Sequence, residues 1–233
     1  ENCRILVTSD IHANLNRFKK LLIEMNYRPG VDYLIINGDL IEKGPQNLET
    51  VQYIKNLAET TMKVYVTLGN CDELIHAVFN DEDLYNYFKQ KPDSLVCSWL
   101  NAVGVDITTR YFSPHEIKEL LNKHYSDEVK WITSFPIALE SDEHIFVHAG
   151  LPKTTTELST KDYEAMLSLR NFYHEGHAMN KIVIVGHYPV RNYHIKDSYD
   201  SSVIIDMNKR IISIDGGNQL DADGQLNGLI ITK

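Results

Sequence analysis

The sequence is poor in the features that mark secreted and membrane proteins. Its 233 residues include three cysteines, Cys3, Cys71 and Cys97, and none of them has C-x-x-C spacing. An odd number of cysteines without that spacing fits a reducing compartment better than a disulfide scaffold, so we expect a cytoplasmic protein. No apolar run approaches the ~20 residues of a membrane span. A signal-peptide pattern of basic, apolar and small-residue regions is also missing at the N-terminus.

Positive charge is also scarce. The chain has 23 Lys and Arg residues against 32 Asp and Glu residues, for a formal net charge of -9. Electrostatic binding of nucleic acid or of an anionic membrane over an extended surface needs a surplus of Lys and Arg, so neither is an expected partner. Bound metal ions could still supply local positive charge and draw in a phosphate group.

The remaining composition is that of a globular protein. Hydrophobic residues make up 43% of the chain and charged residues 24%, with no low-complexity run and no repeat of fixed period. A chain of this length can bury one substantial core, and nothing suggests a second. We therefore expect a single domain over residues 1–233.

Short apolar or β-branched runs predict buried strands in the first and last parts of the chain. The predicted strands are 5–8, 33–37, 64–68, 145–147, 182–185, 203–205, 211–214 and 229–232. Turn residues separate the last three runs, which suggests antiparallel strands or hairpins there. Apolar residues at helical spacing follow a possible cap at Asn14 and recur over 51–58, so the chain is expected to start β-α-β-α-β.

Residues 73–134 carry no convincing strand pattern. Ser113, Pro114 and Glu116 form a capping-box start to a helix that contains Ile117 and Leu121. This segment is therefore predicted to be a helical insert. It directly follows one of the polar clusters described next, so its position would let it influence substrate preference.

Possible metal ligands follow five of the predicted strands. They occur in Ser9-Asp10-Ile11-His12, Gly38-Asp39, Gly69-Asn70-Cys71-Asp72, His148-Ala149-Gly150 and Gly186-His187-Tyr188-Pro189. In open α/β sheets, ligand sites form beyond the carboxyl ends of the strands, so these distant segments are expected to converge.

The residue types suit a pair of metal ions. One residue separates Asp10 from His12, and in an extended chain this spacing places both side chains on one side. The carboxylate of Asp39 can bridge two cations, and the Asn70 carbonyl with the imidazoles of His148 and His187 completes mixed nitrogen and oxygen shells. Such a pair clamps a phosphoryl group and acidifies a bridging water. Each motif alone would more often be a turn or a packed histidine, whereas all of them in this order favour the metal site.

These motifs resemble those of the calcineurin-like metallophosphoesterases, namely Asp-x-His, Gly-Asp, Gly-Asn-(His or Cys), a later His, and Gly-His. The likeness extends to the segments 38–45, 146–151 and 214–217, and it is greatest to small bacterial protein Ser/Thr phosphatases and symmetrical diadenosine tetraphosphate hydrolases. It implies an α+β (α/β) fold of two packed mixed sheets flanked by helices. It also implies two divalent metal ions, among Mn, Fe, Zn, Ni and Co, with Mn favoured.

The resemblance also implies roles for single residues. One ion would be held by Asp10, His12, Asp39 and His187 and the other by Asn70 and His148, with only the bridging role of Asp39 firmly assigned. The expected catalytic residues are Asp39, Asn70, Cys71 and Asp72. The expected phosphate contacts are Arg170, Lys43 and Asn70.

The sequence departs from the family pattern near the predicted phosphate site. Cys71 stands where the protein-phosphatase branch has a His that protonates the leaving group, and a small buried side chain is its alternative role. Lys43 replaces an Arg, and Leu68 replaces another. Arg170 is the best remaining phosphate-binding candidate, although it could also be a solvated helix residue. His76, like Asp72, is a weaker candidate to supply or orient a proton.

Three functions remain open at this point. The first is hydrolysis of phosphate monoesters by a metal-bridging hydroxide, as in a protein Ser/Thr phosphatase. The second is hydrolysis of dinucleoside polyphosphates, and the third is a catalytically weak metal-binding scaffold. The expected partner is a phosphorylated substrate, either a phosphoprotein or a nucleotide. The histidines without ligand-like spacing are His115, His124, His144, His174, His177 and His194.

Overall fold

The strands of the protein form two separate sheets. The computed structural model describes residues 3–195, 197, 199–219 and 224–232. The first sheet has the order β3 (Val64–Thr67), β2 (Tyr33–Asn37), β1 (Arg4–Thr8) and β9 (Gly228–Thr232). The second has the order β4 (Ala138–Glu140), β5 (His144–Val147), β6 (Ile182–Val185), β8 (Ile211–Ser213) and β7 (Ile204–Asp206).

Both sheets are mixed, with parallel strands at their centres. β1 pairs in parallel with β2, and β2 with β3, while β9 runs antiparallel to β1. In the second sheet β5, β6 and β8 are parallel, and β4 and β7 are antiparallel edge strands. The predicted C-terminal antiparallel strands are thus confirmed. The prediction missed β4, whose three residues are partly buried or exposed and whose short apolar run ends at Glu140.

The two sheets pack face to face. A layer of buried side chains from both sheets lies between them, including Val7 and Ile35 from the first sheet and Phe146, Ile184 and Ile212 from the second. Alternate residues of a strand point to opposite faces, so the other apolar residues of the central strands face outward to the helices. The predicted fold of two packed mixed sheets is confirmed.

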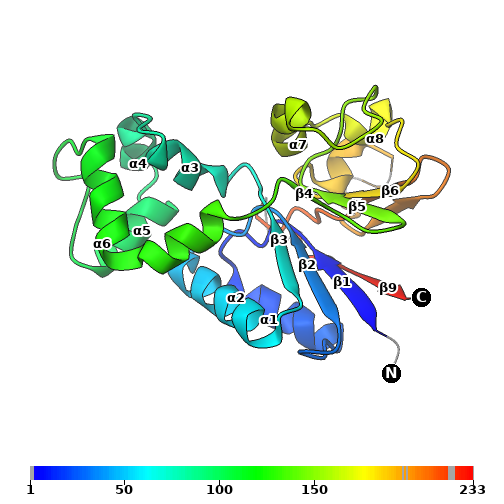
Figure 1. The fold of residues 1–233 in the computed structure, drawn as a ribbon, viewed down its shortest axis with the longest axis horizontal. Helices are drawn as coiled ribbons and strands as arrows, with labels where there is room; N and C mark the ends of the chain where they lie inside the picture. The colour runs from blue at the N-terminus through cyan, green and yellow to red at the C-terminus, as the bar shows by residue number, and fades with distance from the viewer. Residues whose placement is uncertain (1–2, 196, 198, 220–223, 233) are drawn as a thin grey trace.

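Helices cover the outer face of each sheet (Figure 1). On the first sheet these are α1 (Leu15–Glu24) and α2 (Asn47–Thr61), and the predicted cap of α1 is present, since Asn14 Oδ1 accepts from Arg17 N at 3.3 Å. On the second sheet lie α7 (Tyr163–Ser168) and α8 (Phe172–Glu175). The short 3₁₀ helix η1 (Thr160–Asp162) directly precedes α7, and η2 (Val190–Tyr193) follows β6. No helix among the described residues is both long enough and apolar enough to cross a membrane.

The segment 73–134 is helical, as predicted, and all of it is described. It contains α3 (Glu73–Phe79), α4 (Tyr85–Gln90), α5 (Leu95–Ala102) and α6 (Pro114–Thr133). The capping box at the start of α6 is present. These helices lie at the opposite end of the molecule from the two termini (Figure 1).

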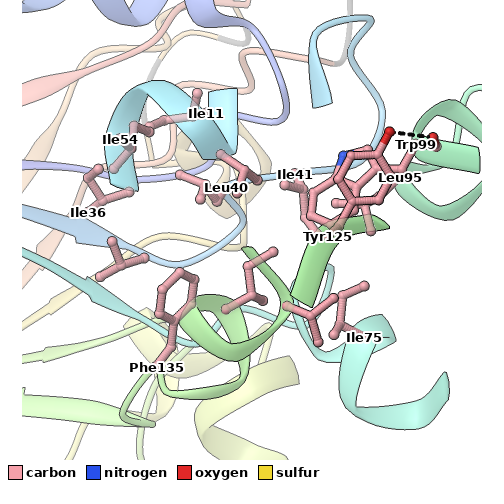
Figure 2. Packing of buried hydrophobic residues seen from close by; sticks show 14 of the residues in the cluster. Ile11, Ile36, Leu40, Ile41, Ile54, Ile75, Leu95, Trp99, Tyr125 and Phe135 are labelled. Carbon is pink, nitrogen blue, oxygen red and sulfur yellow. Dashed lines mark hydrogen bonds between the residues drawn. The ribbon is translucent and has the colours of Figure 1, made fainter. Parts of the chain in front are cut away.

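One hydrophobic cluster joins this insert to the first sheet. Figure 2 shows Leu40 and Ile41 in the same cluster as Trp99 and Tyr125, whose hydroxyl donates to the carbonyl oxygen of Trp99 at 2.8 Å. Leu40 and Ile41 directly follow Asp39, so their burial anchors the loop that carries this carboxylate. On the basis of this shared core we propose that the insert and the sheets form a single domain.

Candidate metal centre and phosphate site

The five polar segments meet at one edge of the two packed sheets. Each follows the carboxyl end of a parallel strand: β1, β2 and β3 in the first sheet, β5 and β6 in the second. Asn37, at the end of β2, connects the sheets there, because its Nδ2 donates to the carbonyl oxygens of Val147 at 2.8 Å and Ile184 at 2.9 Å. The predicted convergence of the strand ends is therefore present in the structure.

The backbone at this edge is strained. Asp10, His12, Asp39 and His187 have φ angles of 54°, 48°, 51° and 63°, in the left-handed region that L-residues rarely adopt. Such a conformation costs on the order of 1–3 kcal/mol per residue and persists only where its surroundings enforce it. Backbone hydrogen bonds do so here, from Asp10 N to Gly38 O and from His12 N to Asp39 O, each 3.0 Å.

The extended geometry expected for Asp10 and His12 is therefore wrong. Both residues are in the left-handed region, because the loops after β1 and β2 are tied together by the hydrogen bonds just described. The two side chains nevertheless meet, with 3.8 Å between Asp10 Oδ1 and His12 Nε2. The proximity of the two side chains was therefore predicted correctly, but from an extended backbone that the structure does not have.

Two groups of metal-capable atoms share the Asp39 carboxylate. His12, Asp39 and Cys71 form one group, and Asp39, His148 and His187 form the other, with the ligand atoms of each group within 4.8 Å of one another. Asp39 Oδ2 lies 3.5 Å from His12 Nε2, and Asp39 Oδ1 lies 3.4 Å from His148 Nε2. This geometry groups His187 with His148 instead of with Asp10 and His12, unlike the split implied by the family resemblance.

Hydrogen bonds fix the imidazoles with Nε2 toward Asp39. His12 Nδ1 lies 3.2 Å from the carbonyl oxygen of Ile41, and His148 Nδ1 lies 3.0 Å from that of Asn37. A carbonyl only accepts, so both Nδ1 atoms carry a proton, and a neutral ring in this orientation presents its Nε2 lone pair to a cation. Asn70 Oδ1, another electron-pair donor to a cation, lies 3.1 Å from His148 Nε2.

The electrostatics of this cluster fit a cation. Burial lowers the pKa of His12 and of His187 to about 4, so both rings are neutral at pH 7, as metal ligation requires. Burial and the charge of Asp39 raise the pKa of Asp10 to about 7. Burial also opposes ionisation of Asp39, yet nearby cationic groups, Lys43 among them, hold its pKa below the usual range. His187 Nε2 is buried and has no hydrogen-bond partner among the described residues. Crowded carboxylates and imidazole lone pairs of this kind are relieved by a positive ion.

A cavity of about 410 Å³ opens in front of the cluster. Its walls include His12, Asn70 and His187, together with the two cationic side chains of Lys43 and Arg170. Lys43 Nζ lies 2.9 Å from His12 Nε2 and donates to its lone pair. The structure thus brings both predicted phosphate-binding cations to one cavity beside the metal-capable groups, while their roles stay predictions.

Asp72 lies behind the site and is fully buried. Its two carboxylate oxygens accept from Leu40 N and Gly69 N, each at 3.0 Å. Burial and the charge of Asp39 raise the pKa of Asp72 to about 8. Asp72 is not among the residues that line the cavity. Asp72 thus joins the loops after β2 and β3, and we propose that it positions the site, while its expected catalytic role stays a prediction.

Cys71 is buried beside Asp39. Its backbone N–H donates to Asp39 Oδ1 at 2.8 Å, and burial, followed by the charge of Asp39, raises the pKa of its thiol well above the usual value. The thiol therefore stays neutral at pH 7. His76 on α3 is half-buried and does not line the cavity. The histidines without ligand-like spacing also lie outside both metal-capable groups found in the described part of the chain.

Sequence reasoning missed several polar residues at the site. Asp215 is buried and lines the cavity, and burial with the nearby Asp10 raises the pKa of its carboxyl well above the usual range. Asn218 donates through Nδ2 to the carbonyl oxygens of Ile11 at 2.9 Å and Asp10 at 3.3 Å, and so holds the first loop. The available signal for Asp215 is the family motif 214–217, which ends directly before Asn218.

The family model for calcineurin-like phosphoesterases matches residues 3–215, which span the convergent strand ends described above. The chain belongs to the calcineurin-like phosphoesterase family. This assignment confirms the predicted family and the expected class of phosphoric ester hydrolase, and the family implies divalent metal ions.

Curated relatives in this family are symmetrical bis(5'-nucleosyl)-tetraphosphatases. That of Buchnera aphidicola is 31% identical over 130 residues, which cover 53% of this chain and 44% of the relative. That of Klebsiella pneumoniae is 30% identical over 166 residues, which cover 68% and 49%. The chain thus spans about half the length of the curated relatives that it matches.

Solved structures in this family share the fold. A candidate diadenosine tetraphosphatase superposes with a TM-score of 0.61 at 17% identity, over 100% of this chain and 97% of the other. A protein serine/threonine phosphatase from Saccharomyces cerevisiae superposes with a TM-score of 0.53 at 12% identity, over 96% and 70%. At these identities the likeness concerns the fold alone.

Proposed function

We propose that this calcineurin-like phosphoesterase hydrolyses the phosphoric anhydride chain of dinucleoside polyphosphates with the help of two divalent metal ions. The observation that carries the proposal is the cavity in which the metal-capable groups around Asp39 meet Lys43 and Arg170. The names of the curated relatives support the substrate class.

The chain's own donors fit the metal part of this proposal. The proposed ligands are Asp10, His12, Asp39, Asn70, His148 and His187. When bound, the ions would neutralise charge on the phosphoryl group and lower the pKa of water. Nitrogen and oxygen donors of this kind suit Mn, Fe, Zn, Ni and Co, and we favour Mn for activity in vitro.

Lys43 and Arg170 would bind the phosphate oxygens. A guanidinium can grip two oxygens of one phosphate group, whereas an ammonium acts as a compact charge. Both side chains are exposed enough to reach a substrate in the cavity that they line. Charge on the oxygens grows as the phosphoryl group transfers, so these contacts stabilise the transition state more than the ground state.

The surroundings of Cys71 favour an anhydride over a phosphoserine substrate. An alkoxide leaving group needs a proton, while a departing phosphate is stable as an anion because its second pKa is about 6. Cys71 is buried and is not among the residues that line the cavity, so it is badly placed to protonate an alkoxide. A nucleoside diphosphate leaves without that help.

Lys43 also lines a second cavity. This cavity measures about 310 Å³. Lys43 reaches it from the loop between β2 and α2, and Gln90, Lys91 and Ser94 of the insert form other parts of its wall. Lys43 borders both cavities. Two adjoining cavities with a shared cation suit a substrate with two ends, and they are the basis on which we propose that the insert contributes to substrate choice.

Phosphate-monoester hydrolysis, as by a protein Ser/Thr phosphatase, is the second candidate. Its support is the fold shared with the yeast phosphatase at 12% identity, which is weaker than the support from the curated relatives. We also propose a cytoplasmic location, because Cys3, Cys71 and Cys97 are all free thiols.

The deciding experiment compares substrates on the Mn²⁺-loaded protein. Diadenosine tetraphosphate should be cleaved symmetrically to ADP, faster than a phosphoserine peptide loses phosphate. Faster release from the peptide would replace the proposal with the phosphatase function. Failure to cleave any phosphate ester or anhydride with Mn²⁺, Fe²⁺, Zn²⁺, Ni²⁺ or Co²⁺ would leave the metal-binding scaffold.

Variants test the assignment of the bridging carboxylate. Asp39→Asn should lower turnover by more than about 100-fold, beyond the usual effect of changing a residue that only orients a metal ligand. Lys43→Ala should lower it by about 10-fold, the effect expected for one charged hydrogen bond. Lys89→Ala is the matched control, since this exposed lysine lies outside both cavities. Near-normal turnover and metal content in Asp39→Asn would refute the bridging assignment.

A further inference from the structure

An aromatic side chain lines the catalytic cavity on the side of the second sheet. Tyr188 directly follows His187, in the segment between β6 and η2, and is half-buried. It forms the cavity wall together with Pro189 and Asn192. Neither the proposed metal ions nor the phosphate groups of a substrate need an aromatic wall, so Tyr188 has no role in the function proposed so far.

The Tyr188 ring is held by other aromatic rings. It packs edge-on against Tyr193 with ring centroids 5.0 Å apart and an interplanar angle of 63°. Tyr193 is 2% exposed and packs in turn against Tyr173 at 5.2 Å and His174 at 5.7 Å. Such backing limits the rotation of Tyr188, so little conformational entropy is lost when a ligand packs on the surface it presents to the cavity.

The rest of the cavity suits a nucleotide. Its volume of about 410 Å³ falls in the range of ~300–1,000 Å³ for small-molecule sites. Arg170 and Lys43 supply cations for phosphate, while the side-chain amide of Asn192 can both donate to and accept from the edge of a base. An aromatic wall, an amide and two cations around one cavity match the base and the phosphates of one ligand.

We propose that Tyr188 is the stacking platform for a nucleobase, the base of the nucleotide whose phosphate lies beside His12 and His187. This inference rests on the function proposed above and deepens it, because it names the part of the chain that would select nucleotides over other phosphate compounds. A phosphopeptide has no general need for such a platform, since its phosphorylated serine or threonine carries no ring.

The test measures the contribution of the base to binding. The dissociation constants of AMP and of ribose 5-phosphate, which differ only in the base, are measured by calorimetry on the Mn²⁺-loaded protein. In the wild type, ribose 5-phosphate should bind about 5- to 150-fold more weakly than AMP, the range that corresponds to one stacked base. In Tyr188→Ala this ratio should fall toward one, mainly through weaker AMP binding.

Further variants separate stacking from folding. Tyr188→Phe keeps the ring and should keep the ratio, whereas Tyr188→Leu keeps an apolar side chain against Tyr193 and should lose it. Tyr65→Ala is the matched control, because this tyrosine on β3 is 43% exposed and lies outside the cavity. Circular dichroism spectra of all variants should match that of the wild type.

Two results would overturn the inference: a wild-type ratio near one, or a ratio that Tyr188→Ala and Tyr188→Leu leave unchanged in folded protein. The dissociation constants of AMP and ribose 5-phosphate are measured at equilibrium and do not require turnover. Failure of the proposed function would appear instead as an inability to cleave diadenosine tetraphosphate. The two failures are therefore distinguishable.

Discussion

Asn37 connects the two sheets beneath the candidate metal centre, and its removal should destabilise the fold. The side chain is fully buried. Its Nδ2 donates to the carbonyl oxygens of Val147 at 2.8 Å and Ile184 at 2.9 Å, and its Oδ1 accepts from Thr67 Oγ1 at 2.9 Å. Asn37→Ala would delete all three hydrogen bonds between parts of the chain that are distant in sequence.

The size of the effect follows from what the substitution leaves behind. Two buried carbonyl oxygens lose a donor, and each unsatisfied buried group costs about 1–3 kcal/mol. The Thr67 hydroxyl can rotate toward another acceptor, so its contribution is smaller. The expected loss is therefore about 2–6 kcal/mol, a large share of the ~5–15 kcal/mol that stabilises a typical domain.

Urea unfolding of the wild type, Asn37→Ala and Thr67→Val measures this directly. Thr67→Val removes only the third hydrogen bond and should cost about 1 kcal/mol. The contact between Asn37 and His148 uses the backbone oxygen, which the substitution retains, so folded Asn37→Ala should keep most of its turnover. The proposed role of Asn37 would be refuted if the free energies of unfolding of Asn37→Ala and wild type differed by less than about 0.5 kcal/mol while both fell with urea concentration at the same slope.

Three other predictions concern the site and the pH response. Arg170→Ala should lower both substrate affinity and turnover, on the order of 100-fold in rate, and Arg170→Lys should recover only part of this loss. Metal content should be unchanged in both variants. Wild-type kinetics of Arg170→Ala on every substrate would exclude a phosphate contact. Cys71→Ser should be mild for esters with phenolate leaving groups; a loss that grows with the basicity of the leaving group would instead assign proton donation to Cys71. Arg28 and Arg4, each 2.6 Å from Asp32, hold the pKa of Asp32 well below its usual range. The stability that Asp32 contributes should therefore be fully present above its unfolded pKa of about 3.9 and be lost as the pH falls below it; thermal unfolding from pH 7 to 3 should show a shallower acid loss in Asp32→Asn.

The convergence of the candidate ligands was predictable because parallel strands end at a common edge. Asp39 and Asn70 follow neighbouring parallel strands of one sheet, and His148 and His187 follow neighbouring parallel strands of the other. Apolar runs identified these strands, and the polar residues directly after them identified the edge. The order of the motifs then indicated the family, which the family model confirms.

The local backbone of the site was less predictable. Asp10 and His12 were expected in an extended chain, whereas both have positive φ angles. Their conformation depends on hydrogen bonds to Gly38 and Asp39, which lie more than twenty residues further along the chain. A local pattern cannot reveal strain that distant segments impose.

Residues that act across the sheets gave no signal in the sequence. Asn37 ends an apolar run and looks like the first polar residue of a turn, yet it is buried between two sheets. Tyr188 follows a candidate ligand and carries no motif of its own, and its place on the cavity wall depends on packing against Tyr193. Asn37 acts through contacts with distant segments, and the Tyr193 ring behind Tyr188 is itself held by Tyr173 and His174 from α8.

The charge balance of the site bears on how a chain with a net charge of -9 would bind the proposed polyphosphate substrate. Asp10, Asp39 and Asp215 are all buried at the site, whereas Lys43 and Arg170 are the cations that its cavity presents. Two positive side chains do not outweigh the Asp39 carboxylate and the phosphates together, and two divalent ions would add four positive charges. Metal binding and phosphate binding should therefore favour each other, since each relieves the repulsion that opposes the other. The acidic composition, which argues against nucleic acid, thus agrees with a small anionic substrate bound through metal ions.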